Sequence, residues 1–148
     1  MIPKKLHFIW IGNNKIPEYS VQFIESWKQL YPDYELIIWT DNLITQYNII
    51  PDTLRDAYND DKFAPAFKAD ILRYLLINRF GGLYFDTDFE PLKRMPDEFL
   101  SFDFLGGVQN NGEVAIGFFG SEIGSIVLED TIQSLIVSIK TSQRNGIL

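Results

Sequence analysis

The sequence predicts one α/β domain in which helices cover a largely parallel central sheet. Short apolar segments alternate along the chain with segments of helical periodicity, and this alternation is typical of βαβ units. A length of 148 residues with 46% apolar residues suits a single domain with a substantial core. No internal repeat or linker divides the sequence, so residues 1–148 are expected to form one unit.

Five short segments have the composition of strands, being runs of mostly apolar residues bounded by turn-forming or charged ones. The first run is interrupted only by His7, which we interpret as a structural histidine in a strand covered on both faces. The sequence Asn110-Asn111-Gly112 separates the last two runs and predicts a hairpin turn. The expected strands are residues 6–11, 35–40, 83–85, 103–108 and 114–119.

Helices are expected between these strands because apolar residues there recur at intervals of three or four. The strongest one begins at Pro65 and is followed by Gly81-Gly82, which are typical start and stop signals. The segment 42–61 is ambiguous apart from one short helix. The expected helices are residues 20–30, 51–58, 65–80 and 121–140. Trp27 and Trp39 fit packing positions in the core.

The composition excludes several classes of function. Thirteen Lys and Arg against 20 Asp and Glu give a net charge of −7, which argues against nucleic-acid binding and against electrostatic docking on an anionic membrane. The absence of cysteine excludes disulfides, thiolate metal sites and thiol catalysis. No apolar run is long enough for a transmembrane segment. We therefore expect a cytoplasmic protein, at most peripheral at the inner face of the membrane.

One face of the expected helix 65–80 is small and polar. Residues at positions i, i+3, i+4 and i+7 of a helix share one face, and here these positions hold Ala66, Ala69, Asp70 and Arg73. The two alanines leave room for a ligand beside the charged pair. Taken alone, an Asp–Arg pair at this spacing is most simply interpreted as a solvated salt bridge.

Two carboxylates, Asp86 and Asp88, follow the short expected strand 83–85. Side chains two residues apart on an extended chain point to the same side. Ligands of open α/β sheets bind at the carboxyl ends of the strands, and paired carboxylates suit a hard divalent cation such as Mn²⁺ or Mg²⁺. The pattern therefore predicts a metal site at this edge of the sheet.

Taken together and in order, these motifs resemble glycosyltransferase family 32, which has a sugar-binding region containing a DXD motif. They resemble more distantly the catalytic domains of clostridial glucosylating toxins. The matching residues are 2–12, 26–27, 31–32, 34–35, 39–41, 70–74 and 81–88. The resemblance implies a GT-A type nucleotide-sugar-binding sandwich, of which this chain would be the N-terminal donor-binding part, truncated at its C-terminal end.

The resemblance also implies a function, which is metal-dependent, retaining transfer of a hexose from a nucleotide sugar. The donor would be a UDP- or GDP-hexose, and the acceptor a glycan or a lipid-linked molecule, in surface polysaccharide (capsule) synthesis. Asp88 would bind Mn²⁺ or Mg²⁺ directly, and Asp86 would lie beside the metal and contact the ribose or the sugar. Arg73 would join them in the catalytic set and contact the sugar and the departing phosphate.

The remaining donor contacts are implied in the same way. Asp70 would bind hydroxyl groups of the donor sugar together with Arg73, and Tyr84 would support the turn or the ribose. Trp10 would stack on the nucleotide base, although its position equally suits a core residue when the resemblance is set aside. Base, sugar, acceptor, linkage and oligomeric state stay open.

The sequence departs from the family pattern in two respects. Family members carry an asparagine in the strand after the DXD turn, and here residues 114–120 contain none. Family chains also continue through a later segment that adds metal and acceptor contacts. Two alternatives therefore stay open. One is a non-catalytic or incomplete sugar-nucleotide-binding module. The other is a haloacid-dehalogenase-like phosphohydrolase, because residues 85–88 superficially resemble the nucleophile motif of those enzymes.

Overall fold

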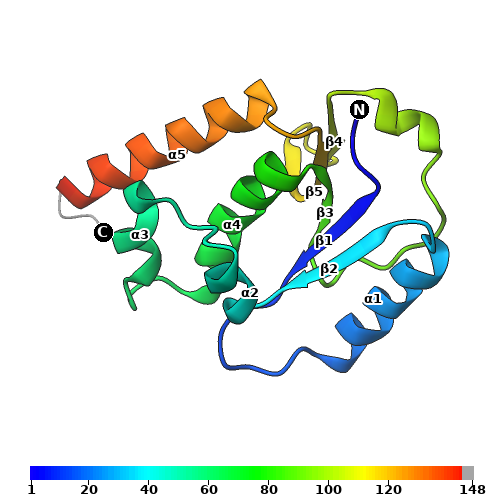
Figure 1. Ribbon diagram of the computed structural model, residues 1–148, viewed down its shortest axis with the longest axis horizontal. Helices are drawn as coiled ribbons and strands as arrows, with labels where there is room; N and C mark the ends of the chain where they lie inside the picture. Colours follow the sequence, from blue (N-terminus) through cyan, green and yellow to red (C-terminus); the bar gives the residue numbers. More distant parts are fainter. Residues whose placement is uncertain (145–148) are drawn as a thin grey trace.

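A computed structural model describes residues 1–144 of the chain. Within them, one five-stranded sheet is covered on both faces by helices (Figure 1). The strands are β1 (Lys5–Ile9), β2 (Glu35–Trp39), β3 (Gly82–Phe85), β4 (Phe104–Val108) and β5 (Val114–Ser121). The helices are α1 (Glu18–Leu30), α2 (Asp41–Gln46), α3 (Asp52–Asn59), α4 (Pro65–Phe80), the 3-10 helix η1 (Asp97–Ser101) and α5 (Ile126–Arg144). The predicted α/β sandwich is confirmed.

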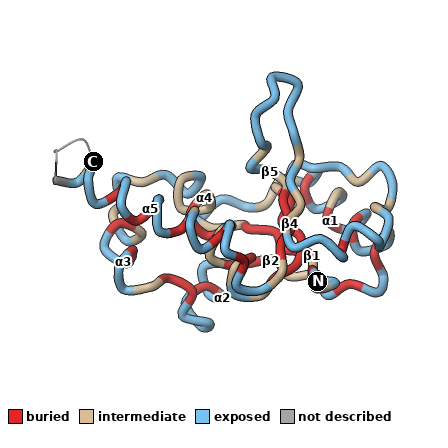
Figure 2. The backbone as a smooth tube through the Cα atoms, turned by 90° about the horizontal axis from the view of Figure 1, so that it is seen from above, coloured by how far each residue is buried: buried red, intermediate tan, exposed pale blue. Residues whose placement is uncertain are grey.

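The strands lie in the order β2-β1-β3-β5-β4. Strand β1 pairs in parallel with β2 and with β3, whereas β5 runs antiparallel between β3 and β4. Four of the five strands of the described chain therefore point the same way, as the prediction of a largely parallel sheet requires. The predicted hairpin joins β4 to β5, and its exposed tip stands away from the rest of the chain (Figure 2).

Alternate residues of β1 contribute to two separate cores. Leu6 and Phe8 pack in the cluster that contains Trp27 of α1, whereas Ile9 packs in the cluster that contains Leu72 of α4. Helix α1 therefore covers one face of the sheet and α4 the other. The chain leaves β1 on one side for β2 and returns on its other side as β3, which makes the carboxyl end of β1 the switch point where α/β sheets bind ligands.

His7 is a structural residue, as predicted. Its side chain is fully buried, its Nε2 lies 2.8 Å from the carbonyl oxygen of Gly81, and its Nδ1 accepts a hydrogen bond of 2.9 Å from Trp39 Nε1. Burial lowers the pKa of His7 to about 4, so the ring is neutral at pH 7. Trp27 and Trp39 are both buried core residues, which confirms their predicted role.

Several predicted boundaries are wrong by a few residues, for local reasons. Strand β1 ends at Ile9 because β2, its parallel partner, ends at Trp39. The last helix begins at Ile126 rather than 121, because β5 continues to Ser121 and Gly124 adopts φ 66° and donates its N–H to the carbonyl oxygen of Asn78. The ambiguous segment 42–61 contains two helices, α2 and α3. No helix in residues 1–144 has the length and apolarity needed to cross a bilayer.

Candidate functional site

The carboxyl ends of β1 and β3 lie side by side, because these strands pair in parallel with Leu6 opposite Leu83 and His7 opposite Tyr84. One open cleft of about 330 Å³ forms there, between these strand ends and the small, polar face of α4. All six site residues predicted from the sequence line it, namely Trp10, Asp70, Arg73, Tyr84, Asp86 and Asp88. Residues from distant parts of the chain thus meet at the switch point of the sheet.

Arg73 is the most constrained of these residues. Its side chain is only 6% exposed, and it donates hydrogen bonds of 2.6 Å to Asp70 Oδ1 and 2.7 Å to the carbonyl oxygen of Ile116. The guanidinium also lies 3.4 Å from Asp86 Oδ1 and 4.9 Å from the centre of the Tyr84 ring. The interpretation of Asp70 and Arg73 as a solvated salt bridge is therefore wrong, because the arginine is buried between two carboxylates.

Asp86 is held from several sides. The hydroxyl of Tyr84 donates a hydrogen bond of 2.6 Å to its Oδ1 atom, and its backbone N–H donates to the carbonyl oxygen of Gly117 on β5 at 2.8 Å. Burial raises the pKa of Tyr84, and the negative charge of Asp86 raises it further, so the tyrosine remains a hydrogen-bond donor throughout the ordinary pH range. The carboxylate of Asp86 consequently has a fixed orientation.

Asp88 differs from Asp86 in being exposed, and nothing in residues 1–144 forms a hydrogen bond or ion pair with its carboxylate. The same part of the chain contains no group of three His, Cys, Asp or Glu side chains that could enclose a metal by itself. A free carboxylate beside a fixed one suits Mg²⁺ or Mn²⁺, which keep several waters and take further oxygen ligands from substrate phosphates. The residues therefore fit a metal held jointly with a phosphorylated ligand.

Trp10 stands at the border of a second cleft of about 260 Å³, which lies between the segment after β1 and the first turn of α4. The two clefts share Ile9, Trp10, Ala66 and Ala69. The indole Nε1 donates a hydrogen bond of 2.8 Å to the carbonyl oxygen of Asn14. The backbone N–H of Trp10 donates a hydrogen bond to the carbonyl oxygen of Trp39. These bonds fix the ring, whose surface is only partly covered.

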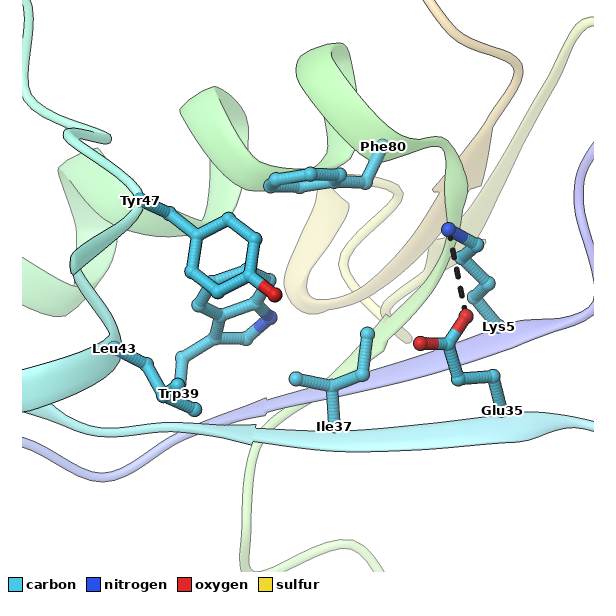
Figure 3. A pocket seen from close by; sticks show the side chains of 7 residues that line it. All are labelled: Lys5, Glu35, Ile37, Trp39, Leu43, Tyr47 and Phe80. Carbon is cyan, nitrogen blue, oxygen red and sulfur yellow. Dashed lines mark ion pairs between the residues drawn. The ribbon is translucent and has the colours of Figure 1, made fainter.

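A third cavity, of about 300 Å³, is separate from this site. It runs along one face of β2, where Trp39, Tyr47 and Phe80 form aromatic walls and the Lys5–Glu35 ion pair of 3.4 Å lies at the end where β2 begins (Figure 3). It contains none of the six site residues predicted from the sequence. The chemistry-bearing side chains identified in the sequence therefore gather at one end of the sheet only.

Sequence reasoning missed three contributors to the site. Tyr19 of α1 lines the cleft, but a tyrosine at the start of an amphipathic helix carries no signal of such a position. Ile116 and Gly117 contribute only backbone carbonyl groups, to Arg73 and to Asp86 respectively. Any residue can offer a carbonyl group, so the side-chain pattern does not reveal them.

Comparison with solved structures supports the fold. The structure titled "PaToxG Glycosyltransferase" superposes with a TM-score of 0.70 at 17% sequence identity, covering 97% of this chain and 63% of that one. At this level of identity the likeness concerns the fold alone, and it confirms the expected GT-A type sandwich.

Comparison of sequences identifies the family. Inositol phosphoceramide mannosyltransferase 3 of Schizosaccharomyces pombe is 34% identical over 99 residues, which are 59% of this chain and 24% of the relative. Mannosyl phosphorylinositol ceramide synthase CSH1 of Saccharomyces cerevisiae is 33% identical over 122 residues, 75% of this chain and 31% of the relative. The chain thus spans a quarter to a third of these relatives. Residues 17–105 match the family described as "Glycosyltransferase sugar-binding region containing DXD motif", and the chain belongs to that family.

Proposed function

We propose that this chain is the donor-binding part of a metal-dependent, retaining glycosyltransferase that takes a hexose from a UDP- or GDP-hexose. One observation carries the proposal. The two DXD carboxylates, Asp70 with its buried partner Arg73, and the ring of Trp10 line a single cleft at the switch point of the sheet. Family membership supplies the reaction class, and the cleft supplies the groups that such a donor requires.

The two carboxylates of the DXD motif have different roles in this proposal. Asp88, exposed and unpaired within residues 1–144, would ligate Mn²⁺ or Mg²⁺ together with the donor diphosphate. When bound, that cation neutralises the charge of the departing phosphate. Asp86, fixed by Tyr84 and Arg73, would accept hydrogen bonds from hydroxyl groups of the ribose or sugar, as oriented carboxylates do.

In this proposal the donor sugar would lie beside the Asp70–Arg73 pair. Asp70 remains about half exposed, with 45% of its side chain accessible, so one carboxylate oxygen is free to accept hydrogen bonds from sugar hydroxyls. Because the net charge of the chain is −7 and Arg73 lies between two carboxylates, the metal and the guanidinium together would have to supply the local attraction for an anionic donor. Trp10 would offer its indole face to the base, which the adjoining cleft has room to hold.

Retention follows most simply by attack on the same face as the departing phosphate. Asp86 is engaged by a hydrogen bond of 2.6 Å from Tyr84 and lies 3.4 Å from the guanidinium of Arg73, so it is poorly placed to act as a covalent nucleophile. The same engagement argues against the phosphohydrolase alternative, which needs a free aspartate at this position.

The acceptor is proposed from the relatives. Their names describe mannosyl transfer to an inositol phosphoceramide, so mannose is the first sugar to test and a lipid-linked molecule the first acceptor. A glycan acceptor in surface polysaccharide synthesis is the second choice. Either acceptor is compatible with a protein that works at the inner face of a membrane.

The test is calorimetric titration of UDP, GDP and their hexose conjugates, with and without Mn²⁺. Asp88→Asn is compared with Glu90→Gln, a matched amide substitution two residues away at an exposed position outside the cleft. We expect one nucleotide family to bind the wild type only when Mn²⁺ is present. The affinity of Asp88→Asn for that nucleotide should be at least ten-fold lower, a loss of binding free energy of about 1.4 kcal/mol or more. Glu90→Gln should bind like the wild type.

Metal-independent binding, or equal affinities for Asp88→Asn and the wild type, would refute the metal site. Metal-dependent binding with no transfer of labelled sugar to any acceptor would identify the chain as a binding module rather than a complete enzyme.

A further inference from the structure

Strand β5 borders the candidate site through its backbone. Its pairing with β4 is interrupted there, because Phe119 lies opposite Gly106 and Ala115 lies opposite Gly107. The residues between them have no partner on β4, and the carbonyl oxygen of Ile116 accepts the hydrogen bond of Arg73 instead. Such irregularities commonly occur in strands next to active sites.

Gly117 lies at the centre of this interruption and directly against Asp86. A Cβ atom at Gly117 would lie 2.7 Å from Asp86 Oδ2, and 3.0 Å and 3.2 Å from two ring carbons of Phe89. The first distance is too short for any side chain to be tolerated without movement of the carboxylate, because protein interiors are close-packed. No other residue type fits this position with Asp86 as it is.

We infer that Gly117 is a positioning residue for Asp86, an inference that rests on the proposed function. Tyr84 and Arg73 approach Oδ1 of the carboxylate, while Oδ2 lies against the bare Cα of Gly117. The backbone N–H of Asp86 donates to the carbonyl oxygen of this same glycine at 2.8 Å. The glycine therefore sets both the backbone and the carboxylate of Asp86 with respect to the cleft.

A purely structural role would work through Phe89 instead. The Phe89 ring packs against Phe85 with centroids 6.2 Å apart, and the backbone carbonyl oxygen of Phe89 accepts a hydrogen bond of 2.8 Å from Trp27 Nε1. If Gly117 serves only to admit this ring, a smaller side chain at position 89 should compensate for an added methyl group. If Gly117 instead positions the carboxylate of Asp86, a smaller side chain at position 89 should not restore binding.

The experiment compares Gly117→Ala with Gly107→Ala. The matched control adds a methyl group on the adjacent strand, where the new Cβ would meet Phe118 at 3.4 Å and Ala115 at 3.6 Å, which are ordinary contacts. Calorimetry with Mn²⁺ and UDP, and with Mn²⁺ and GDP, should show at least a ten-fold loss of affinity for Gly117→Ala and none for Gly107→Ala. The loss should persist in Gly117→Ala/Phe89→Leu, which also serves as the test protein if the single variant does not fold.

A double-mutant cycle then asks whether Gly117 acts through Asp86. In an Asp86→Asn background, Gly117→Ala should weaken binding less than two-fold further, because coupled substitutions are not additive. Three results would overturn the inference: wild-type affinity of Gly117→Ala, restoration by Phe89→Leu, or an undiminished loss in the Asp86→Asn background.

A second readout needs neither metal nor nucleotide. The ¹³C resonance of Tyr84 Cζ, assigned with Tyr84→Phe, reports the hydrogen bond to Asp86. The chemical shift of this resonance should change in Gly117→Ala and should be unchanged in Gly107→Ala. If the wild type binds no nucleotide with Mn²⁺, the proposed function fails, and this resonance alone decides the inference: an unchanged Tyr84 signal in Gly117→Ala would refute it.

Discussion

The hydroxyl of Tyr84 donates a hydrogen bond of 2.6 Å to Asp86 Oδ1, two residues further along the chain. Alternate residues of an extended chain share one side, so both side chains point toward α4, where Arg73 lies over the tyrosine ring. The ring of Tyr84 is only 2% exposed, which makes it a rigid support. The DXD motif therefore consists of one carboxylate fixed by the core and one, Asp88, that remains exposed.

Replacing Tyr84 with phenylalanine tests this support. The ring is kept and the hydrogen bond to Asp86 is lost, so the free energy of unfolding should fall by roughly 1.5–3 kcal/mol, as for hydrogen bonds to charged groups. The affinity for Mn²⁺ with nucleotide should fall about ten-fold, equivalent to about 1.4 kcal/mol. Tyr58→Phe is the matched control, because the Tyr58 hydroxyl is buried with no hydrogen-bond partner in the described part of the chain. Equal behaviour of the two variants in urea unfolding and calorimetry would contradict the proposed role.

Trp10 should report nucleotide binding by fluorescence. Trp27 and Trp39 are 5% and 2% exposed and contribute to the cores, whereas Trp10 is partly exposed in the cleft. Stacking of a base on its indole should quench the emission when Mn²⁺ and the nucleotide are both present. Trp10→Phe should remove most of this quenching and weaken binding several-fold. Quenching that persists in Trp10→Phe would place the base elsewhere.

Arg73→Lys should lower the free energy of unfolding far more than the same substitution at Arg55. Both arginines pair with an aspartate three residues earlier, at 2.6 Å for Arg73 with Asp70 and 2.7 Å for Arg55 with Asp52, but their side chains are 6% and 46% exposed. A lysine cannot reproduce the forked contacts of a buried arginine, so Arg73→Lys should cost about 3 kcal/mol, at the lower end of the range for a broken buried pair. Arg55→Lys should cost less than about 0.5 kcal/mol, as exposed pairs do. Urea unfolding of both variants measures the difference, and similar losses would refute the assigned burial.

The sequence predicted the structure best where residues close together in the chain determine the local backbone conformation. Pro65 and Gly81 are strong helix signals, and the helix between them has the predicted bounds, Pro65–Phe80. Asp86 and Asp88 both line one cleft just after β3, but residues 87–88 form a turn, so the alternation expected of an extended chain does not explain their positions. The burial of Arg73 was not predictable, because it depends on the carbonyl oxygen of Ile116, 43 residues away. Local patterns carry no information about such a contact.

The same limit applies to His7. Its position in an apolar run predicted a structural role, but its partners Trp39 and Gly81 come from two distant elements. Burial among these elements is the main reason why the pKa of the ring is lowered, and this has a measurable consequence for stability.

Stability should fall as the pH is lowered from 6.5 to 4 because of this one histidine. Its pKa is lowered from 6.5 to about 4, chiefly by burial, so between these values the unfolded chain binds a proton that the folded chain does not. The contribution is fully present above pH 6.5 and is lost as the pH falls toward 4, with an upper limit of about 3 kcal/mol. Urea unfolding at a series of pH values measures this slope.

His7→Gln is the matched variant for this measurement. It should be less stable than the wild type at pH 7, because the contacts with Gly81 and Trp39 are disturbed, but its stability should depend less on pH between 6.5 and 4, where only carboxylates still contribute. His7 is the only histidine of the chain, so a single imidazole signal should be visible by NMR, and it should titrate near pH 4. A signal that titrates near pH 6.5, or equal slopes for the two proteins, would show that the ring is accessible and would contradict the buried network.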